Sequence, residues 1–171
     1  MEGREDQPLT PEMLCARYAP RVHRFAAMVA AGDVEAEDLA QDALVRAIRN
    51  LGRYDAHLGS VETWLWRIVV NTAIDAGRVS TRRRRLWERF RSQPTTAENV
   101  EDLALLRITA AELLTAVRRL RPRERGMIAL RFGAGLGFAD VGGAYGISPA
   151  AATMATRRAL DTLRTLLKET I

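Results

Sequence analysis

The most constraining feature of this sequence is a long helical pattern that runs from Gly59 to Arg85 and ends in four consecutive arginines. Its apolar residues recur at spacings of three and four, so they share one side of an α-helix and need a partner surface. These residues are Val61, Trp64, Leu65, Ile68, Val69 and Thr72. The residues expected largely off that side are Trp66, Arg67, Asn71, Asp75 and Arg78. Such a helix can pack against protein and also contact nucleic acid, because bases stack on aromatic rings and phosphates attract guanidinium groups. A core helix with a solvated, charged tail is the alternative.

Composition bounds the class of protein. The 171 residues suffice for one domain or two small ones with a buried core. The longest apolar stretch, Phe25 to Ala31, is too short to span a bilayer, and the N-terminal MEGREDQP lacks a signal-peptide core. We therefore expect a cytoplasmic protein without membrane insertion. The single cysteine, Cys15, excludes an internal disulfide or a cysteine-based zinc site.

The charge distribution indicates a polyanionic partner. The net charge is +5, and nearly all basic residues are arginine, which suits bidentate contacts to phosphate and guanine. Residues 1–88 are balanced, residues 89–106 are slightly acidic, and residues 107–171 carry the positive excess. The C-terminal part is therefore the part expected to bind a polyanion.

Two helices are predicted before the tryptophan helix. The first covers Pro11 to Ala31 in spite of Pro20, and its apolar stripe is formed by Leu14, Tyr18, Val22, Phe25 and Val29. The second starts at Asp33, which is expected to be its N-cap. The second helix presents one polar face, formed by Asp38, Gln41, Asp42, Arg46, Arg49 and Asn50. Its carboxylates could also indicate magnesium or acid/base chemistry, but no histidine or second carboxylate cluster lies nearby in the pattern. We expect neither a metal nor any other cofactor.

The segment from Leu86 to Val100 contains SQPTTAEN and has no periodic apolar face, which is typical of a linker. The chain is therefore predicted to be all-α, with two helical domains joined by a flexible linker. The predicted boundaries are residues 1–86 for the first domain, 87–102 for the linker and 103–171 for the second domain.

The second domain has the pattern of a helix-turn-helix. A helix marked by leucines from Leu103 to Leu120 is followed by one that opens at Pro122. A short helix then leads through a turn at Gly146 to Ser148, which is expected to cap a long final helix. A helix of that size can enter the DNA major groove, although a buried helical hairpin without a DNA role has the same pattern.

The order and spacing of these motifs resemble the extracytoplasmic-function (ECF) sigma factors of bacterial RNA polymerase. Val34 to Asp42, continuing from Arg46 to Leu51, looks like the family's segment that binds the polymerase clamp. Thr63-Trp64-Leu65, Arg67-Ile68, Asn71, Asp75 and Arg78 match the segment that melts and reads the minus-ten element. Leu120 to Arg125, Leu130-Arg131-Phe132, Gly135-Leu136 and Tyr145 to Ser148 are similar to the domain that reads the minus-thirty-five element.

The resemblance implies a role for each set of residues. Core polymerase binding would fall to Asp38, Gln41, Asp42, Arg46, Arg49 and Asn50. Minus-ten DNA would be contacted by Tyr54, His57, Ser60, Trp64, Trp66, Arg67, Asn71, Asp75, Arg78, Arg82, Arg83, Arg84 and Arg85. Minus-thirty-five DNA would be contacted by Arg131, Ser148, Pro149, Ala151, Thr153, Met154, Arg157 and Arg158. The implied partners are core RNA polymerase, promoter DNA and, as a further candidate, an anti-sigma factor.

The expected function is promoter selection without catalysis. No nucleophile and base occur at a catalytic spacing, and strand separation needs only a surface that stabilises single strands. The final helix departs from the family, because Thr153, Ala155 and Thr156 occupy the places where a Lys or Arg, followed at helical spacing by an apolar residue, is usual. We therefore expect discrimination to depend more on the minus-ten side. The alternatives are a sigma-like adaptor that binds polymerase without upstream readout and, less in accord with residues 33–85, a helix-turn-helix repressor.

Overall fold

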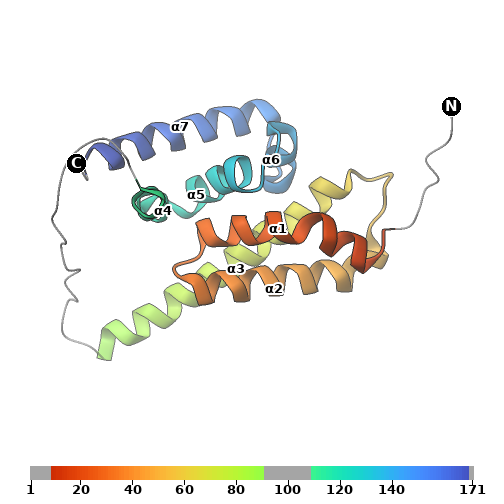
Figure 1. Ribbon diagram of the computed structural model, residues 1–171, viewed down its shortest axis with the longest axis horizontal. Helices are drawn as coiled ribbons and strands as arrows, with labels where there is room; N and C mark the ends of the chain where they lie inside the picture. Colours follow the sequence, from red (N-terminus) through yellow and green to blue (C-terminus); the bar gives the residue numbers. More distant parts are fainter. Residues whose placement is uncertain (1–8, 91–108, 170–171) are drawn as a thin grey trace.

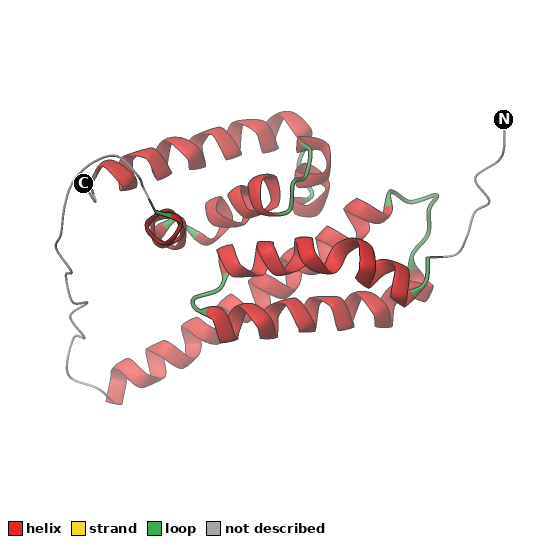
Figure 2. Ribbon diagram, in the orientation of Figure 1, coloured by secondary structure: helices red, strands yellow, loops and turns green. Residues whose placement is uncertain are grey.

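The structure, a computed structural model, describes residues 9–90 and 109–169, with only the backbone given for residues 83–90. All regular elements in these ranges are helical, as predicted (Figure 2). The N-terminal part contains α1 (Pro11–Val29), α2 (Asp33–Asn50), the short 3-10 turn η1 (Leu51–Arg53) and α3 (Val61–Phe90). The C-terminal part contains α4 (Ala110–Arg119), α5 (Pro122–Ile128), the π-helical turn η2 (Ala129–Gly133), α6 (Phe138–Tyr145) and α7 (Pro149–Lys168).

The first three helices pack around the apolar stripe predicted for α1. Leu14, Tyr18, Val22 and Phe25 are all buried, Val29 is half-buried, and α1 continues through Pro20. In Figure 1, α1 and α2 lie beside each other and α3 crosses them. This arrangement fixes which sides of α2 and α3 remain free for binding.

Two local predictions in this part were wrong. Asp33 is the first residue of α2 rather than its N-cap, which is Gly32, and Gly32 makes no side-chain capping bond. Asp33 still places negative charge at the positive end of the helix dipole. The backbone of α3 continues to Phe90, so residues 87–90, predicted as linker, are helical. Neither proline nor glycine interrupts the chain between Gly77 and Phe90.

The C-terminal part begins with a well-capped helix. Thr109 and Glu112 form a reciprocal capping box at the start of α4. Residues 91–102 of the predicted linker, and the start of the leucine-marked helix at Leu103, lie outside the described residues. Pro122 is the first residue of α5, as its position predicted.

The predicted helix-turn-helix is formed by α6 and α7. The turn passes through Gly146, which has a left-handed conformation with φ of 66°. Ser148 then caps α7, because its Oγ accepts a hydrogen bond of 3.2 Å from the backbone N–H of Ala151. Sequence-local signals therefore set the geometry of this motif.

The two parts pack directly against each other. α6 lies against α3 (Figure 1), and η2 packs against α1. One hydrophobic core contains Val22, Phe25 and Trp66 of the N-terminal part together with Leu130 and Val141 of the C-terminal part. The predicted two-part organisation is thus present, but the parts share a core.

Candidate nucleic-acid interface

The start of α3 carries a partly exposed aromatic pair. The rings of Tyr54 and Trp64 have centroids 5.4 Å apart and are tilted by 51°. The Tyr54 hydroxyl donates a hydrogen bond of 3.3 Å to the carbonyl of Gly59. Ser60, predicted to contact DNA, has its Oγ occupied by a hydrogen bond from the backbone N–H of Thr63 at 3.1 Å. The two rings remain available for stacking, while Ser60 holds the helix start.

The loop that precedes α3 is exposed and locally ordered. The backbone N–H of His57 donates to the Asp55 carboxylate at 2.8 Å, which is the pattern of an Asx turn. Leu58 follows with 87% of its surface exposed. The sequence pattern pointed to His57 but not to Leu58, an exposed apolar side chain in the loop between Tyr54 and Trp64.

Trp66 is not a DNA-stacking residue in this structure, and its predicted placement off the buried side was wrong. Its side chain is 0% exposed, and it meets Phe25 in an edge contact with centroids 5.9 Å apart. The indole Nε1–H donates to Glu62 at 3.1 Å, and the Arg21 guanidinium lies 5.5 Å from the ring. The helical period predicted one buried side, but α3 packs against α1, α2 and α6 and has more than one.

Beyond Trp66, a polar stripe follows the exposed side of α3. Arg67, Asn71, Arg78 and Arg82 are exposed and are separated by four, seven and four residues, so they share one face. Arg67 donates a hydrogen bond of 3.2 Å to the carbonyl of Gly143 in α6. The stripe from Arg67 to Arg82 extends about 22 Å along the helix. The predicted Arg83, Arg84 and Arg85 continue α3, but their side chains lie outside the described residues.

The polar face of α2 is largely exposed, as predicted from its spacing. Asp38, Gln41, Asp42 and Arg49 are exposed, whereas Arg46 and Asn50 are half-buried. Gln41 donates to Glu37 at 3.1 Å, and Asn50 donates to the backbone carbonyl of Arg46 at 2.8 Å.

Arg46 joins the two predicted surfaces. Its guanidinium forms an ion pair with Asp42 at 3.0 Å and another with Asp75 of α3 at 3.3 Å. Asp75, predicted to contact DNA, also lies 3.8 Å from Arg78. An anionic group cannot attract phosphate, so its observed contacts indicate a role in fixing α2 against α3.

The first half of α7 exposes the residues predicted for upstream DNA. Pro149, Ala151, Thr153, Met154, Arg157 and Arg158 are exposed, with Met154 at 53%. Arg131 does not join them. It is half-buried, donates to the carbonyl of Leu136 at 2.9 Å and lies 5.1 Å from the Phe138 ring. These contacts hold the turn before α6, so the structure indicates a structural role for Arg131 instead of the predicted contact with DNA.

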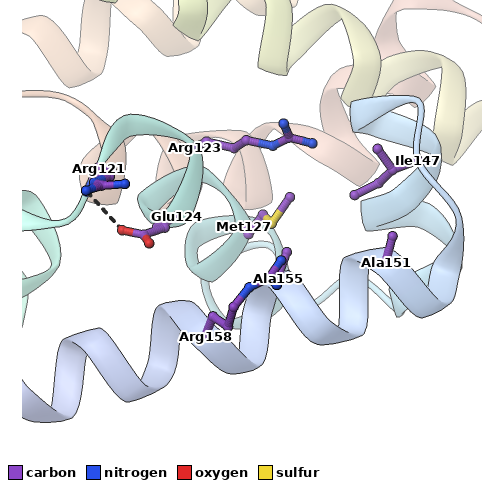
Figure 3. A pocket seen from close by; sticks show the side chains of 8 residues that line it. All are labelled: Arg121, Arg123, Glu124, Met127, Ile147, Ala151, Ala155 and Arg158. Carbon is purple, nitrogen blue, oxygen red and sulfur yellow. Dashed lines mark hydrogen bonds between the residues drawn. The ribbon is translucent and has the colours of Figure 1, made fainter.

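A basic pocket beside α7 was missed by sequence reasoning. Its volume is about 350 Å³, and it opens between α5 and α7 (Figure 3). Its lining combines arginines with an apolar floor and consists of Arg121, Arg123, Glu124, Met127, Ile147, Ala151, Ala155 and Arg158. The Arg121-Pro122-Arg123 run at a helix start was a signal that could have found it. Three arginines here can hold a phosphate group beside α7.

Burial changes the acidity of two groups near this interface. Desolvation raises the pKa of Asp140 in α6, and the neighbouring Glu62 carboxylate raises it further. Desolvation also raises the pKa of Tyr145 to about 12. Burial thus makes ionisation of both side chains less favourable where α6 packs.

The described residues set bounds on other site types. In residues 9–90 and 109–169, no group of three or more histidines, cysteines or carboxylates is arranged to hold a metal ion. No helix within the described part is both long and apolar enough to cross a membrane.

Within the described residues, a capped helix-turn-helix, an aromatic pair and an arginine-rich polar stripe along α3 are together typical of a DNA-binding protein. Comparison with known proteins identifies the family. The family model described as Sigma-70 region 2 matches residues 14–85. The chain is 35% identical to the RNA polymerase sigma factor CarQ of Myxococcus xanthus, over 92% of this chain and 89% of that protein. It is also 31% identical to the ECF sigma factor BldN of Streptomyces coelicolor, over 90% of this chain and 58% of that protein. The chain belongs to the ECF RNA polymerase sigma factors.

Solved structures agree on the fold. The sigma factor RpoE of Bartonella quintana, solved with the anti-sigma factor NepR, has a TM-score of 0.68 at 21% identity, covering 92% of this chain and 96% of that one. CnrH, solved with the cytosolic domain of CnrY, has a TM-score of 0.65 at 20% identity, covering 93% and 88%. As a sigma factor, the chain is a non-catalytic subunit that directs RNA polymerase to promoters for transcription initiation.

Proposed function

We propose that residues 1–86 bind core polymerase and melt and read the minus-ten element, and that residues 103–171 bind the upstream element. Residues 87–102 would connect them, and the protein would act in the cytoplasm, where polymerase meets DNA. Within this scheme, promoter discrimination depends more on α3 and its preceding loop than on α7.

The observation that carries this proposal is the composition of the free side of α3. The aromatic pair of Tyr54 and Trp64 begins a surface that continues along the polar stripe of α3 to Arg82. Stacking contributes about 1–3 kcal/mol per base, and a line of cations holds the backbone of a separated strand. A surface of this kind stabilises a melted strand relative to the duplex.

The upstream side offers less direct readout. Thr153 has its hydroxyl bonded to the carbonyl of Pro149 at 2.9 Å, and Ala151 offers only a methyl group. Each good bidentate contact would discriminate by about 1–3 kcal/mol. Arg158 lies with Arg121 and Arg123 around the pocket, which suits phosphate contact rather than base readout.

The test is run-off transcription with core polymerase and this protein on a promoter library, followed by separate scrambling of each element of a recovered promoter. We expect a greater loss from scrambling the minus-ten element. A greater loss from scrambling the upstream element would contradict the proposal. Equal activity on both the intact and the upstream-scrambled promoter would favour the adaptor alternative, in which polymerase binding persists without upstream readout.

The arginines of the polar stripe on α3 can be tested through the salt dependence of DNA binding. Arg82→Gln should weaken DNA binding about equally on different promoters and lower the salt slope by about one unit, as expected for one lost phosphate contact. Arg164→Gln is the matched control, because Arg164 is exposed at the far end of α7 and pairs with Asp161. A changed sequence preference in Arg82→Gln would contradict a phosphate contact.

The polymerase-binding face can be tested on α2. Asp38 is exposed, so Asp38→Lys should preserve the fold while greatly reducing co-purification with core enzyme. Asp42→Lys should also reduce co-purification with core enzyme. It breaks the ion pair to Arg46 as well, so its effect is harder to assign to polymerase binding alone. Asp161→Lys on α7 is the charge-matched control. Unchanged co-purification of Asp38→Lys would remove α2 from the proposed binding site.

An anti-sigma factor is a proposed further partner. The solved structures with the same fold were determined with the anti-sigma factor NepR and with the cytosolic domain of CnrY. A cognate protein of this class should inhibit run-off transcription at stoichiometric concentration. Inhibition that is relieved by an excess of core polymerase, but not by an excess of this chain, would point to a target other than this chain.

A further inference from the structure

The basic pocket between α5 and α7 is larger than a single phosphate group requires. Its volume of about 350 Å³ falls within the range of about 300–1,000 Å³ that is typical of small-molecule sites. In Figure 3, Arg123 and Arg158 lie on opposite sides of Met127, and Ile147 lies toward the turn before α7. The pocket therefore has an apolar middle between cations that come from two helices.

The arginines of this pocket are not neutralised by their neighbours. Among the described residues, none of Arg121, Arg123 and Arg158 forms an ion pair with a carboxylate. Glu124, the one carboxylate in the lining, accepts a hydrogen bond of 3.3 Å from the backbone N–H of Arg121. The guanidinium of Arg123 lies 5.8 Å from the centre of the Tyr145 ring. Three guanidinium groups are thus available to an anion, and together they can contact more than one phosphate group.

The floor of the pocket suits a ring rather than a second charged group. Ala151 and Ala155 are one turn apart on α7, so their methyl groups lie on one face of the helix. Met127 adds a polarisable sulfur, which makes favourable contacts with aromatic rings. A DNA backbone would bring only sugar and phosphate to this floor. The lining therefore matches a ligand that carries both phosphates and a flat, largely apolar ring.

We propose that this pocket binds a small molecule of the nucleoside polyphosphate class, with its base on the apolar floor and its phosphates on the arginines. Ala151 and Arg158 belong both to the pocket lining and to the surface predicted for upstream DNA. A bound nucleotide therefore excludes DNA from part of α7 and weakens upstream binding. This second step rests on the proposed upstream role of α7, whereas nucleotide binding itself does not.

Isothermal titration calorimetry of the full chain in magnesium-free buffer tests the site directly. The probes are ATP and GTP, and inorganic tripolyphosphate and adenosine represent the two halves of the ligand. We expect one nucleotide per chain, bound at least tenfold more tightly than either half, because only the whole molecule contacts both the floor and the arginines. Absence of nucleotide binding would overturn the proposal. Equal affinity for tripolyphosphate would also overturn it, because the arginines alone would then account for binding.

Exposed side chains supply the variants for this titration. Arg123→Gln and Arg158→Gln should each weaken nucleotide binding about tenfold, because each removes a charge-assisted contact. Ala151→Leu should also weaken it, because the larger side chain fills the floor while every charge remains. Arg157→Gln is the matched control for nucleotide binding, because Arg157 is exposed next to Arg158 but lies outside the lining. Equal weakening in Arg157→Gln would show attraction to the basic surface of α7 in general and would overturn the proposal.

Competition with DNA is measured on the holoenzyme, with a duplex that carries only the upstream element. Sodium chloride in the reference sample matches the ionic strength that the nucleotide adds. The tighter-binding nucleotide, at ten times its dissociation constant, should raise the dissociation constant of the duplex about tenfold, as for two ligands that exclude each other. Holoenzyme with Arg123→Gln should show a rise of only about twofold, because the same concentration then roughly equals its weakened dissociation constant. An equal rise in that variant would place the nucleotide elsewhere on the polymerase and overturn the proposal.

The two measurements separate this inference from the proposed function. If the duplex with the upstream element binds no better than a scrambled duplex, the proposed upstream role of α7 is wrong, and calorimetry still decides whether the pocket binds nucleotide. If the duplex binds specifically and its affinity does not respond to a nucleotide that calorimetry shows to be bound, the competition is wrong and the role of α7 stands.

Discussion

The two neighbouring tryptophans of α3 should respond to mutation in opposite ways. Trp66 is fully buried in the core that the two parts share, with its ring against Phe25 of α1, whereas Trp64 is partly exposed beside Tyr54. We therefore expect Trp66→Ala to reduce the stability of the fold. We expect Trp64→Ala to reduce promoter recognition in a protein that remains folded.

The magnitude follows from what each ring contacts. Replacing a fully buried tryptophan by alanine costs about 3–5 kcal/mol, because the transferred apolar surface is lost and a cavity remains. Trp66→Ala also leaves Glu62 without the indole donor, although Arg21 still binds that carboxylate. Against a total stability of about 5–15 kcal/mol, the loss is large. Trp64→Ala removes a partly exposed ring and a tilted aromatic contact of about 0.5–1.5 kcal/mol.

Urea unfolding followed by circular dichroism measures the first effect. With a slope of about 2 kcal/mol per molar urea, the midpoint of Trp66→Ala should fall by about 2 M, and that of Trp64→Ala by well under 1 M. Run-off transcription, at a temperature where both variants are folded, measures the second. A small stability loss in Trp66→Ala, accompanied by loss of minus-ten dependence, would refute the burial argument and return Trp66 to the DNA surface.

Three further results are expected. The raised pKa of Tyr145, about 12 against an ordinary 10, means that folding favours the neutral phenol, so this stabilisation is complete below about pH 10 and is lost as pH rises toward 12. Between pH 10 and 12, the free energy of unfolding of wild type, measured by denaturant titration, should therefore fall by about 2–3 kcal/mol more than that of Tyr145→Phe. An equal fall in the two proteins would contradict this prediction. The added methyl group of Gly126→Ala would collide with the Tyr145 hydroxyl and should lower the free energy of unfolding by about 1–3 kcal/mol. In a double-mutant cycle, Tyr145→Phe should restore most of this loss. Stability changes of the two substitutions that simply add would exclude the contact. Arg46→Ala removes the ion pair between α2 and Asp75, but it should lower the free energy of unfolding by only about 1 kcal/mol, because the pair is half-exposed. A loss above about 3 kcal/mol in urea unfolding would show a larger structural role.

Several features of this protein were determined by the sequence itself. The buried stripe of α1, the first position of α5 at Pro122 and the Ser148 cap of α7 all matched their predictions. Each depends on interactions within a few residues: the helical period, the fixed φ of proline, and a side-chain oxygen that bonds the N–H three residues later. The exposed polar face of α2 follows from the same period. The family resemblance also came from such local motifs, read in order along the chain.

Tertiary structure decided which faces of the helices are covered. The period of α3 gave the angle between Trp64 and Trp66. It did not show that a second surface, which includes Phe25 and Arg21 of α1, would bury Trp66. The ion pair from Arg46 to Asp75 and the approach of Gly143 to Thr63 join residues distant in the chain. The helical period specifies in which direction each side chain leaves its own helix. Burial and ion pairing also depend on which other helices pack against that side, and this is determined only when the whole core forms.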